Sequence, residues 1–468
     1  MTITRRSGEL DMSRAKRRAV YNLFWAGTGI LVITAGAAGL KKIDLERFRG
    51  HPERMRRLRE APLPVLDAGQ AGLGDWPQWR GPNRDGLSPE GGLLAAWPKA
   101  GPRVLWAKTI GRGFSSLAVA GGRVYTMVQE PAPDDPRAPA RLANYEAVVC
   151  WDADTGRELW RFRYGNRYDE RFGSGPRSTP AVDGNLVYTV GPTGIFHCLR
   201  ADTGDKVWRH DLLEEFHGSQ PQYGVSFSPL VEGDLVYAVP GGAGGCSVAA
   251  FDKRSGKLAW MALDDPPGYS SPVAATAAGV RQILFLTNTA LVSLCPRDGR
   301  LYWRHPWQTD GGFNIATPVA FDNYVFVSSA YGKGCALLEV SAAADGSLRV
   351  APVYEHNRMR NYFASSVRYG GHIYGFDNSD LACMDIRTGR VVWRRPGFKK
   401  GCLLVADGHL IILGEDGRLA LAEATPDGYR ETASFQVSGN KCWTVPALAG
   451  GRLYVRDEGQ LACLDLRR

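Results

Sequence analysis

Residues 178–208 read STPAVDGNLVYTVGPTGIFHCLRADTGDKVW. Three short apolar runs in this segment are separated by an Asp-Gly turn at 183–184 and a Gly-containing turn at 191–194. A fourth run, which ends at Trp208, follows a tight Asp-Thr-Gly turn. Runs rich in β-branched and aromatic residues between such turns are typical of strands. The segment therefore predicts four antiparallel strands joined by three turns.

The same unit recurs along most of the chain, at residues 115–160, 226–260, 270–303, 316–354, 365–393 and, more faintly, 402–435. An eighth unit starts at Thr444, but the chain reaches Arg468 before a fourth strand. Residues 104–108, VLWAK, supply a fourth-strand pattern just before the first unit. Repeated four-stranded units are typical of a β-propeller. The sequence thus predicts an all-β, eight-bladed propeller closed by pairing of its two ends, with seven blades as the alternative count.

A tryptophan recurs four residues after the Gly of the last tight turn in five units, on the strand expected to be outermost. The Gly takes a positive φ in the tight turn, and the Trp can then stack on the neighbouring blade. We therefore assign a structural docking role, and no ligand-binding role, to Trp106, Trp160, Trp208, Trp260, Trp303 and Trp393.

The chain carries a net charge of +9, and the whole excess lies near its start. Residues 1–59 hold 14 Lys and Arg against 5 Asp and Glu, whereas residues 60–468 hold 43 of each. A nucleic-acid-binding protein is expected to carry a basic face on its folded domain. The balanced charge after residue 60 therefore disfavours nucleic acid as a partner.

Residues 19–40 contain no charged side chain, and at ~1.5 Å per residue the stretch can cross a ~30 Å hydrocarbon layer. We expect a transmembrane anchor here; a cleaved signal peptide is the alternative, because Ala35-Gly36-Ala37 has the small residues that signal peptidase needs. Both flanks are basic, so the positive-inside rule does not decide the orientation. The second basic cluster fits either an anionic lipid surface or a solvated stalk. The expected regions are a basic segment (1–18), the anchor (19–40), a basic juxtamembrane region and linker (41–74), a Trp-rich lead-in (75–102) and the propeller (103–468).

Five of the nine cysteines recur at one place in successive units: Cys150, Cys198, Cys295, Cys383 and Cys463. Equivalent positions in different blades are too far apart for a disulfide, which needs Cα atoms within about 7 Å. We expect these residues to be small, buried apolar side chains. No Cys pair or Cys/His cluster has zinc spacing, so the sequence predicts no metal site of that kind.

Residues 153–160, ADTGRELW, and 201–208, ADTGDKVW, resemble the tryptophan-docking repeats of the pyrroloquinoline-quinone (PQQ)-like propeller family. Residues 75–82, DWPQWRGP, resemble the opening of many membrane-linked bacterial members. The resemblance runs from Asp75 to the end of the chain and implies the fold, not one function. The family includes quinoprotein alcohol and glucose dehydrogenases and the outer-membrane assembly lipoprotein BamB.

A likeness to the dehydrogenases implies a carboxylate base, oxygen ligands around Ca²⁺ and, in many members, a disulfide between adjacent cysteines. The chain has no adjacent Cys pair and no recognisable calcium pattern, so we assign no catalytic residue. BamB-like lipoproteins carry a lipidated Cys near their start, whereas the first Cys here is Cys150. Ser115, Ser116, Ser270 and Ser271 lie at strand starts without a matched His, and we interpret them as backbone-bonding residues rather than nucleophiles.

The residues just before each innermost strand should ring the central channel. In this chain cations alternate with aromatics there, a set that can hold an anionic ligand, PQQ included, with the rings stacking on it. Ordinary, partly exposed loop residues are the alternative. The candidate ligand-binding residues are Arg112, Phe114, Arg177, Tyr223, Tyr269, Asn314, Phe363, Lys400, Lys441 and Trp443.

The sequence thus favours a membrane-anchored, extracytoplasmic propeller that binds an unidentified protein partner without catalysis. The alternative is a PQQ-dependent dehydrogenase for alcohols or sugars, with PQQ and Ca²⁺ in the central funnel.

Overall fold

The computed structural model describes residues 74–131 and 144–468. The basic segment 1–18, the expected anchor 19–40 and residues 41–73 lie outside the described residues. In the part of the chain that is described, no helix has the length and apolar character needed to cross a bilayer.

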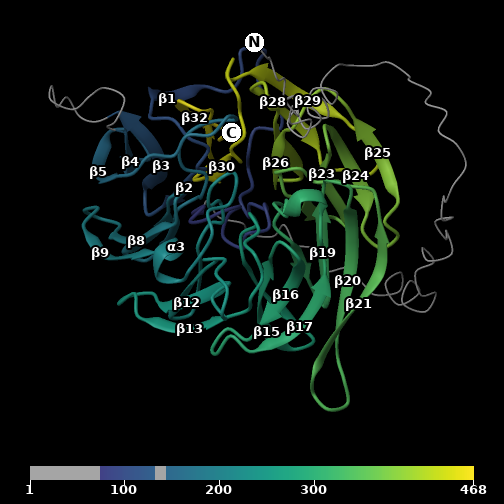
Figure 1. The fold of residues 1–468 in the computed structure, drawn as a ribbon. Helices are drawn as coiled ribbons and strands as arrows, with labels where there is room; N and C mark the ends of the chain where they lie inside the picture. Colours follow the sequence, from purple (N-terminus) through teal and green to yellow (C-terminus); the bar gives the residue numbers. More distant parts are fainter. Residues whose placement is uncertain (1–73, 132–143) are drawn as a thin grey trace, which may run out of the picture. The chain divides into compact units, whose positions relative to one another are not determined.

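Residues 104–131 and 144–468 form eight four-stranded antiparallel sheets that follow one another around a ring in chain order (Figure 1). From the innermost strand outward, blades 1 to 4 are β2 (Ala118–Ala120), β3 (Arg123–Pro131), β4 (Asn144–Asp152), β5 (Glu158–Gly165); β6 (Ala181–Asp183), β7 (Leu186–Val190), β8 (Ile195–Arg200), β9 (Lys206–Asp211); β10 (Leu230–Glu232), β11 (Leu235–Ala238), β12 (Val248–Asp252), β13 (Leu258–Ala262); β14 (Val273–Ala277), β15 (Val280–Leu286), β16 (Ala290–Leu294), β17 (Leu301–Pro306). Blades 5 to 8 are β18 (Val319–Phe321), β19 (Tyr324–Ser329), β20 (Gly334–Ala342), β21 (Leu348–His356); β22 (Val367–Tyr369), β23 (His372–Asp377), β24 (Asp380–Asp385), β25 (Val391–Arg395); β26 (Cys402–Ala406), β27 (His409–Leu413), β28 (Arg418–Glu423), β29 (Glu431–Gln436); β30 (Ala447–Ala449), β31 (Arg452–Arg456), β32 (Gln460–Asp465), β1 (Val104–Thr109). A short helix, α3 (Leu212–Glu215), and a 3₁₀ turn, η2 (Asp310–Gly312), lie in the connections.

The ring closes as the sequence predicts, because β1 pairs antiparallel with β32 and becomes the outermost strand of blade 8. Trp106 lies opposite Cys463 in this pair. The count of eight blades is confirmed. Because β1 completes blade 8, the two ends of the chain are joined in one sheet, and β32 is not left as an unpaired sheet edge.

The recurring tryptophans lock each blade to the next one. Trp160 on β5 donates its indole N–H to the carbonyl of Ala201 in blade 2 at 3.0 Å, and its ring lies against Gly204 in the same turn. Gly204 has φ +78°, and a Cβ there would lie 2.6 Å from the indole. The same donation to the next blade is made by Trp106 to Ala153, Trp208 to Lys253, Trp260 to Pro296 and Trp393 to Thr425. Each of these five indoles therefore contacts the next blade.

Trp303 is the exception among the six predicted docking residues. Its indole donates to Gln282 Oε1 of its own blade at 2.7 Å rather than to blade 5. Blade 5 has no Asp-Thr-Gly turn to receive it, because the hairpin of β20 and β21 is extended to nine residues a strand. In blade 5 itself, Tyr354 takes the tryptophan position and donates to the Ile386 carbonyl at 3.0 Å.

Hydroxyl groups at strand starts join neighbouring blades near the channel. Ser271 Oγ accepts the backbone N–H of Ser228 at 2.9 Å, and Ser116 Oγ accepts that of Val445 at 2.9 Å across the closure. The backbone N–H groups of Thr179 and Thr317 likewise donate to a serine hydroxyl in the next blade, Ser228 and Ser365 respectively. Ser115 likewise accepts the N–H of Met127, and Ser270 donates to the carbonyl of Ala316. All four serines singled out in the sequence therefore bond backbone groups, as predicted.

All nine cysteines are buried and none forms a disulfide. Burial raises the pKa of Cys150 to about 12, so the thiol is neutral at physiological pH. The prediction of small buried side chains is confirmed for the five repeat positions.

Residues 75–93, which we call the strap, cross the middle of the ring ahead of the first blade (purple in Figure 1). Trp76 pairs with Val119 of β2, and Ser88 donates to Val405 of β26. Glu90 accepts the N–H groups of Gly450 and Gly451 in the turn that follows β30. Further along the strap, Arg80 and Arg84 donate to carbonyls just before β22 and β10. The strap thus contacts innermost strands along the channel. We call the end of the channel where the connections lead into the innermost strands the mouth.

A buried carboxyl lies between blades 1 and 2. Glu146 on β4 is fully buried; its Oε2 accepts from Tyr164 at 2.5 Å and from Asn166, while its Oε1 has no partner. Asn166 also donates to Thr193 of blade 2. Loss of solvent outweighs these bonds and raises the pKa of Glu146 to about 7.

This shift predicts how stability depends on pH. An ordinary glutamate in the unfolded chain ionises near pH 4.5. Below that pH the carboxyl is neutral in both states and does not lower the free energy of unfolding. As the pH rises towards 7, the unfolded chain ionises more readily than the folded one, so folding stability falls. We compare the free energy of unfolding of Glu146→Gln with that of the wild type at each pH. The stability of the variant relative to the wild type is expected to be greater by about 3 kcal/mol at pH 8 than at pH 4. Urea unfolding at the two pH values measures this difference, with the exposed Glu214→Gln as the control. Parallel pH profiles for wild type and Glu146→Gln would show that the buried carboxyl does not titrate in this way.

Candidate functional site at the channel mouth

The ten candidate residues all lie in the connections that lead into innermost strands, at the mouth. Each of the eight connections contributes at least one of them, from Arg112 and Phe114 between β1 and β2 to Lys441 and Trp443 between β29 and β30. The local cause is the repeat itself, since each connection crosses from the outermost strand of one blade to the innermost strand of the next. The side chains that precede the innermost strands therefore converge.

Aromatic side chains at the mouth contact one another in a continuous series, which we call the aromatic belt. Successive ring centroids lie 4.8 to 6.1 Å apart, in tilted and edge-on arrangements that aromatic pairs favour. The series returns to its start because Gly173, next to Phe172, packs on Phe114, where a Cβ would lie 2.2 Å from the ring. The belt consists of Phe114, Phe172, Tyr223, Tyr269, Phe313, Tyr331, Tyr362, Phe363 and Trp443.

Two of the candidate cations lie over rings of the belt. Lys400 Nζ is 3.9 Å from the ring centroid of Tyr362, and Lys441 Nζ is 4.4 Å from that of Trp443. Both distances are within the range of cation–π attraction. Lys441 also donates to the carbonyl of Phe172 at 2.7 Å, which ties two distant connections together.

Two of the predicted cations differ in their surroundings. Arg177 donates to the carbonyls of Gly173 and Gly175 at 2.8 and 2.7 Å, and burial lowers the pKa of its guanidinium. The guanidinium Nη2 of Arg177 also lies 4.0 Å from the carboxylate Oε2 of Glu170. Arg112 is exposed, although its backbone pairs with Gln129 of β3. Arg177 thus holds its own loop in shape, whereas Arg112 extends into solvent.

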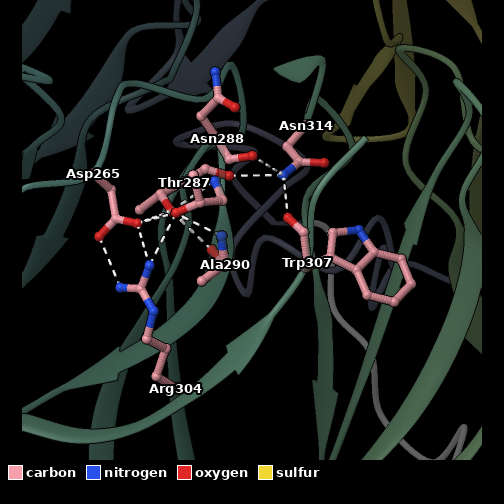
Figure 2. Close-up of polar contacts among 8 residues, drawn as sticks. Asp265, Thr287, Asn288, Ala290, Arg304, Trp307 and Asn314 are labelled. Carbon is pink, nitrogen blue, oxygen red and sulfur yellow. Dashed lines mark hydrogen bonds and ion pairs between the residues drawn. The ribbon is translucent and has the colours of Figure 1, made fainter. Parts of the chain in front are cut away.

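Asn314 does not face the mouth as a free amide. Its Nδ2 donates to the carbonyls of Thr287, Asn288 and Trp307 (Figure 2). Its Oδ1 accepts from Ser329. The side chain is fully buried. Every polar atom of this amide is used within blades 4 and 5, so Asn314 positions the connection and offers nothing to a ligand.

The sequence reasoning missed four belt residues. Phe313 and Tyr362 directly precede the predicted Asn314 and Phe363, and the aromatic residue at each position was the available signal. Phe172 lies within the long connection between β5 and β6, and Tyr331 lies in the turn between β19 and β20. Neither position precedes an innermost strand, so the repeat pattern carries no signal for them.

The residues at the mouth do not fit PQQ with Ca²⁺. The predicted amide ligand, Asn314, has no free oxygen or nitrogen, and Arg177 is committed to backbone carbonyls of its own loop. Within residues 74–131 and 144–468, no group of three His, Cys, Asp or Glu side chains could hold a metal ion. We therefore derive no reaction step through this cofactor.

Eight four-stranded blades, five of them docked on the next blade by a tryptophan, are typical of the PQQ-like class of β-propeller. The family model described as "Outer membrane protein assembly factor BamB" matches residues 144–395, more than half of the chain. The chain belongs to this family.

Among curated proteins, the chain is similar to the outer membrane protein assembly factor BamB of Yersinia pestis, with 25% identity over 292 residues, 60% of this chain and 72% of the relative. The crystal structure of BamB from Moraxella catarrhalis aligns with a TM-score of 0.53 and 13% identity, covering 79% of this chain and 99% of that one. The quinohemoprotein alcohol dehydrogenase of Comamonas testosteroni aligns with a TM-score of 0.57 and 13% identity, covering 88% and 83%. At these identities the structural matches show the shared fold alone.

Proposed function

We propose that this chain is an extracytoplasmic scaffold that binds a protein partner at the mouth and is tethered to a membrane through residues 19–40. The observation that carries the proposal is the aromatic belt. Rings that pack on one another present a half-buried apolar surface with lysines on it, and aromatic residues are the side chains most enriched at protein interfaces. The names of the BamB relatives, which are assembly factors, support a scaffold over an enzyme.

Photo-cross-linking from the mouth tests this proposal. Phe172 in the belt and Leu258 on the outermost strand β13 have nearly equal exposure, 40% and 39%, so they form a matched pair for a benzoylphenylalanine probe. In cells that express the full chain, we expect the probe at position 172 to give one discrete adduct with another protein, recovered with the membrane fraction, and the probe at 258 to give none. The protein identified in the adduct, once purified, should bind the full chain in detergent. Equal adduct yields at the two positions, or no binding by the purified protein, would refute the mouth as the docking site.

A further inference from the structure

Two lysines at the mouth have no carboxylate of the described residues within ion-pair distance of their ammonium groups, although Glu415 lies at the belt, where it accepts the indole N–H of Trp443 at 2.9 Å. Among the described residues, neither Lys400 nor Lys441 forms an ion pair with Asp or Glu, although each ammonium lies over an aromatic ring. Lys399, the neighbour of Lys400, does pair with Asp416 at 3.5 Å. The belt thus carries two ammonium groups without an ion-pair partner in the described part of the chain, and the exposed Arg112 and Arg171 add positive charge at the mouth.

The lysines lie beside an exposed ring. The ammonium group of Lys441 donates one hydrogen bond to the carbonyl of Phe172 at 2.7 Å, and its other two hydrogens can bind another acceptor. The Phe172 ring is 40% exposed and contacts Tyr223 edge-on at 5.8 Å. Lys400, Lys441 and Phe172 come from three different connections, so a ligand that meets all of them must offer several groups along its length.

We propose that the mouth binds an extended, acidic segment of a polypeptide that also carries an aromatic side chain. The carboxylates of the segment accept charge-assisted hydrogen bonds from Lys400 and Lys441, and its ring packs on Phe172 and Tyr223. The inference rests on the proposed function, because it names the part of a protein partner that the mouth recognises. A small inorganic anion would use the lysines and leave the exposed ring uncovered.

Labelled peptides test this chemistry on the purified full chain. A short peptide that alternates Glu with Phe is expected to bind, as measured by fluorescence anisotropy, whereas peptides that alternate Lys with Phe or Glu with Ala bind at least about tenfold more weakly. The double variant Lys400→Gln/Lys441→Gln is expected to weaken binding of the Glu/Phe peptide by about tenfold, with a thermal unfolding midpoint like that of the wild type. Lys399→Gln is the matched control and should leave the affinity unchanged. Equal affinities for the Glu/Phe and Lys/Phe peptides, or full affinity in the double variant, would overturn the inference.

The peptide and cross-linking results separate the two proposals. A protein adduct at position 172 together with no peptide binding would refute the acidic-segment chemistry and leave the scaffold standing. Peptide binding without any protein adduct would support the recognition chemistry and count against the scaffold. An adduct whose yield falls in the double variant supports both.

Discussion

Trp208→Ala is expected to lower the free energy of unfolding by about 4 kcal/mol, the range observed for large buried aromatics. The Trp208 side chain is 8% exposed, its N–H bonds the Lys253 carbonyl of blade 3 at 3.1 Å, and its ring meets Phe196 edge-on at 5.0 Å. Alanine leaves a cavity between blades 2 and 3 and removes one of two bonds to the Lys253 carbonyl, to which the Tyr188 hydroxyl also donates at 2.9 Å. Urea unfolding followed by circular dichroism measures the loss.

Three further variants separate the causes. Trp208→Phe removes the N–H and keeps a ring, so we expect a loss of about 1 kcal/mol. Gly256→Ala is expected to cost about 1–3 kcal/mol, because Gly256 has φ +73° and a Cβ would lie 2.7 Å from the indole. Val207→Ala, at a residue that is 44% exposed on the same strand, should change stability by less than about 0.5 kcal/mol. A Trp208→Ala loss no larger than that of Val207→Ala would contradict the docking role.

The blades were predictable because their determinants are local. The Gly turn and the Trp that follows it are only a few residues apart, and the same spacing in successive units reveals the repeat without any knowledge of the fold. The closure by β1 could be predicted because the last unit lacks a fourth strand and residues 104–108 supply one before the first unit. The positions of Phe114, Tyr223 and Trp443 at the mouth followed in turn, since the repeat fixes which residues precede each innermost strand.

Contacts between residues far apart in the sequence were not predictable. Whether Trp303 docks depends on the hairpin of the next blade, and the position of Tyr331 in the belt depends on how a turn folds over the mouth. The segment 75–82 has the composition of a lead-in, and nothing in its sequence places it inside the ring. Its partners lie as far as 286 residues away, as in the bond from Arg80 to the Ser366 carbonyl. Such contacts become visible only once the ring exists.

The strap carries the second large effect, through Arg84. Its guanidinium is buried in the channel and donates to the carbonyls of Ser228 and Pro229 at 2.8 Å and to Gln78 Oε1 at 2.9 Å. Burial lowers the pKa of Arg84 to about 9, yet the side chain stays charged at neutral pH. Arg84→Ala removes two buried bonds and one partly buried bond and opens a cavity, so we expect the free energy of unfolding to fall by about 4 kcal/mol.

Two companion variants test whether this loss comes from the strap's hold on the ring. Asn83→Ala changes an exposed neighbour and should alter stability by less than about 0.5 kcal/mol. Arg84→Met fills most of the volume and removes a buried charge, so we expect its loss to be smaller, about 2 kcal/mol, from the unpaired carbonyls alone. Urea unfolding of the three variants ranks them. If Arg84→Ala unfolds at the same urea concentration as Asn83→Ala, the strap is bound too weakly to stabilise blade 3, and the channel arginine has no structural role.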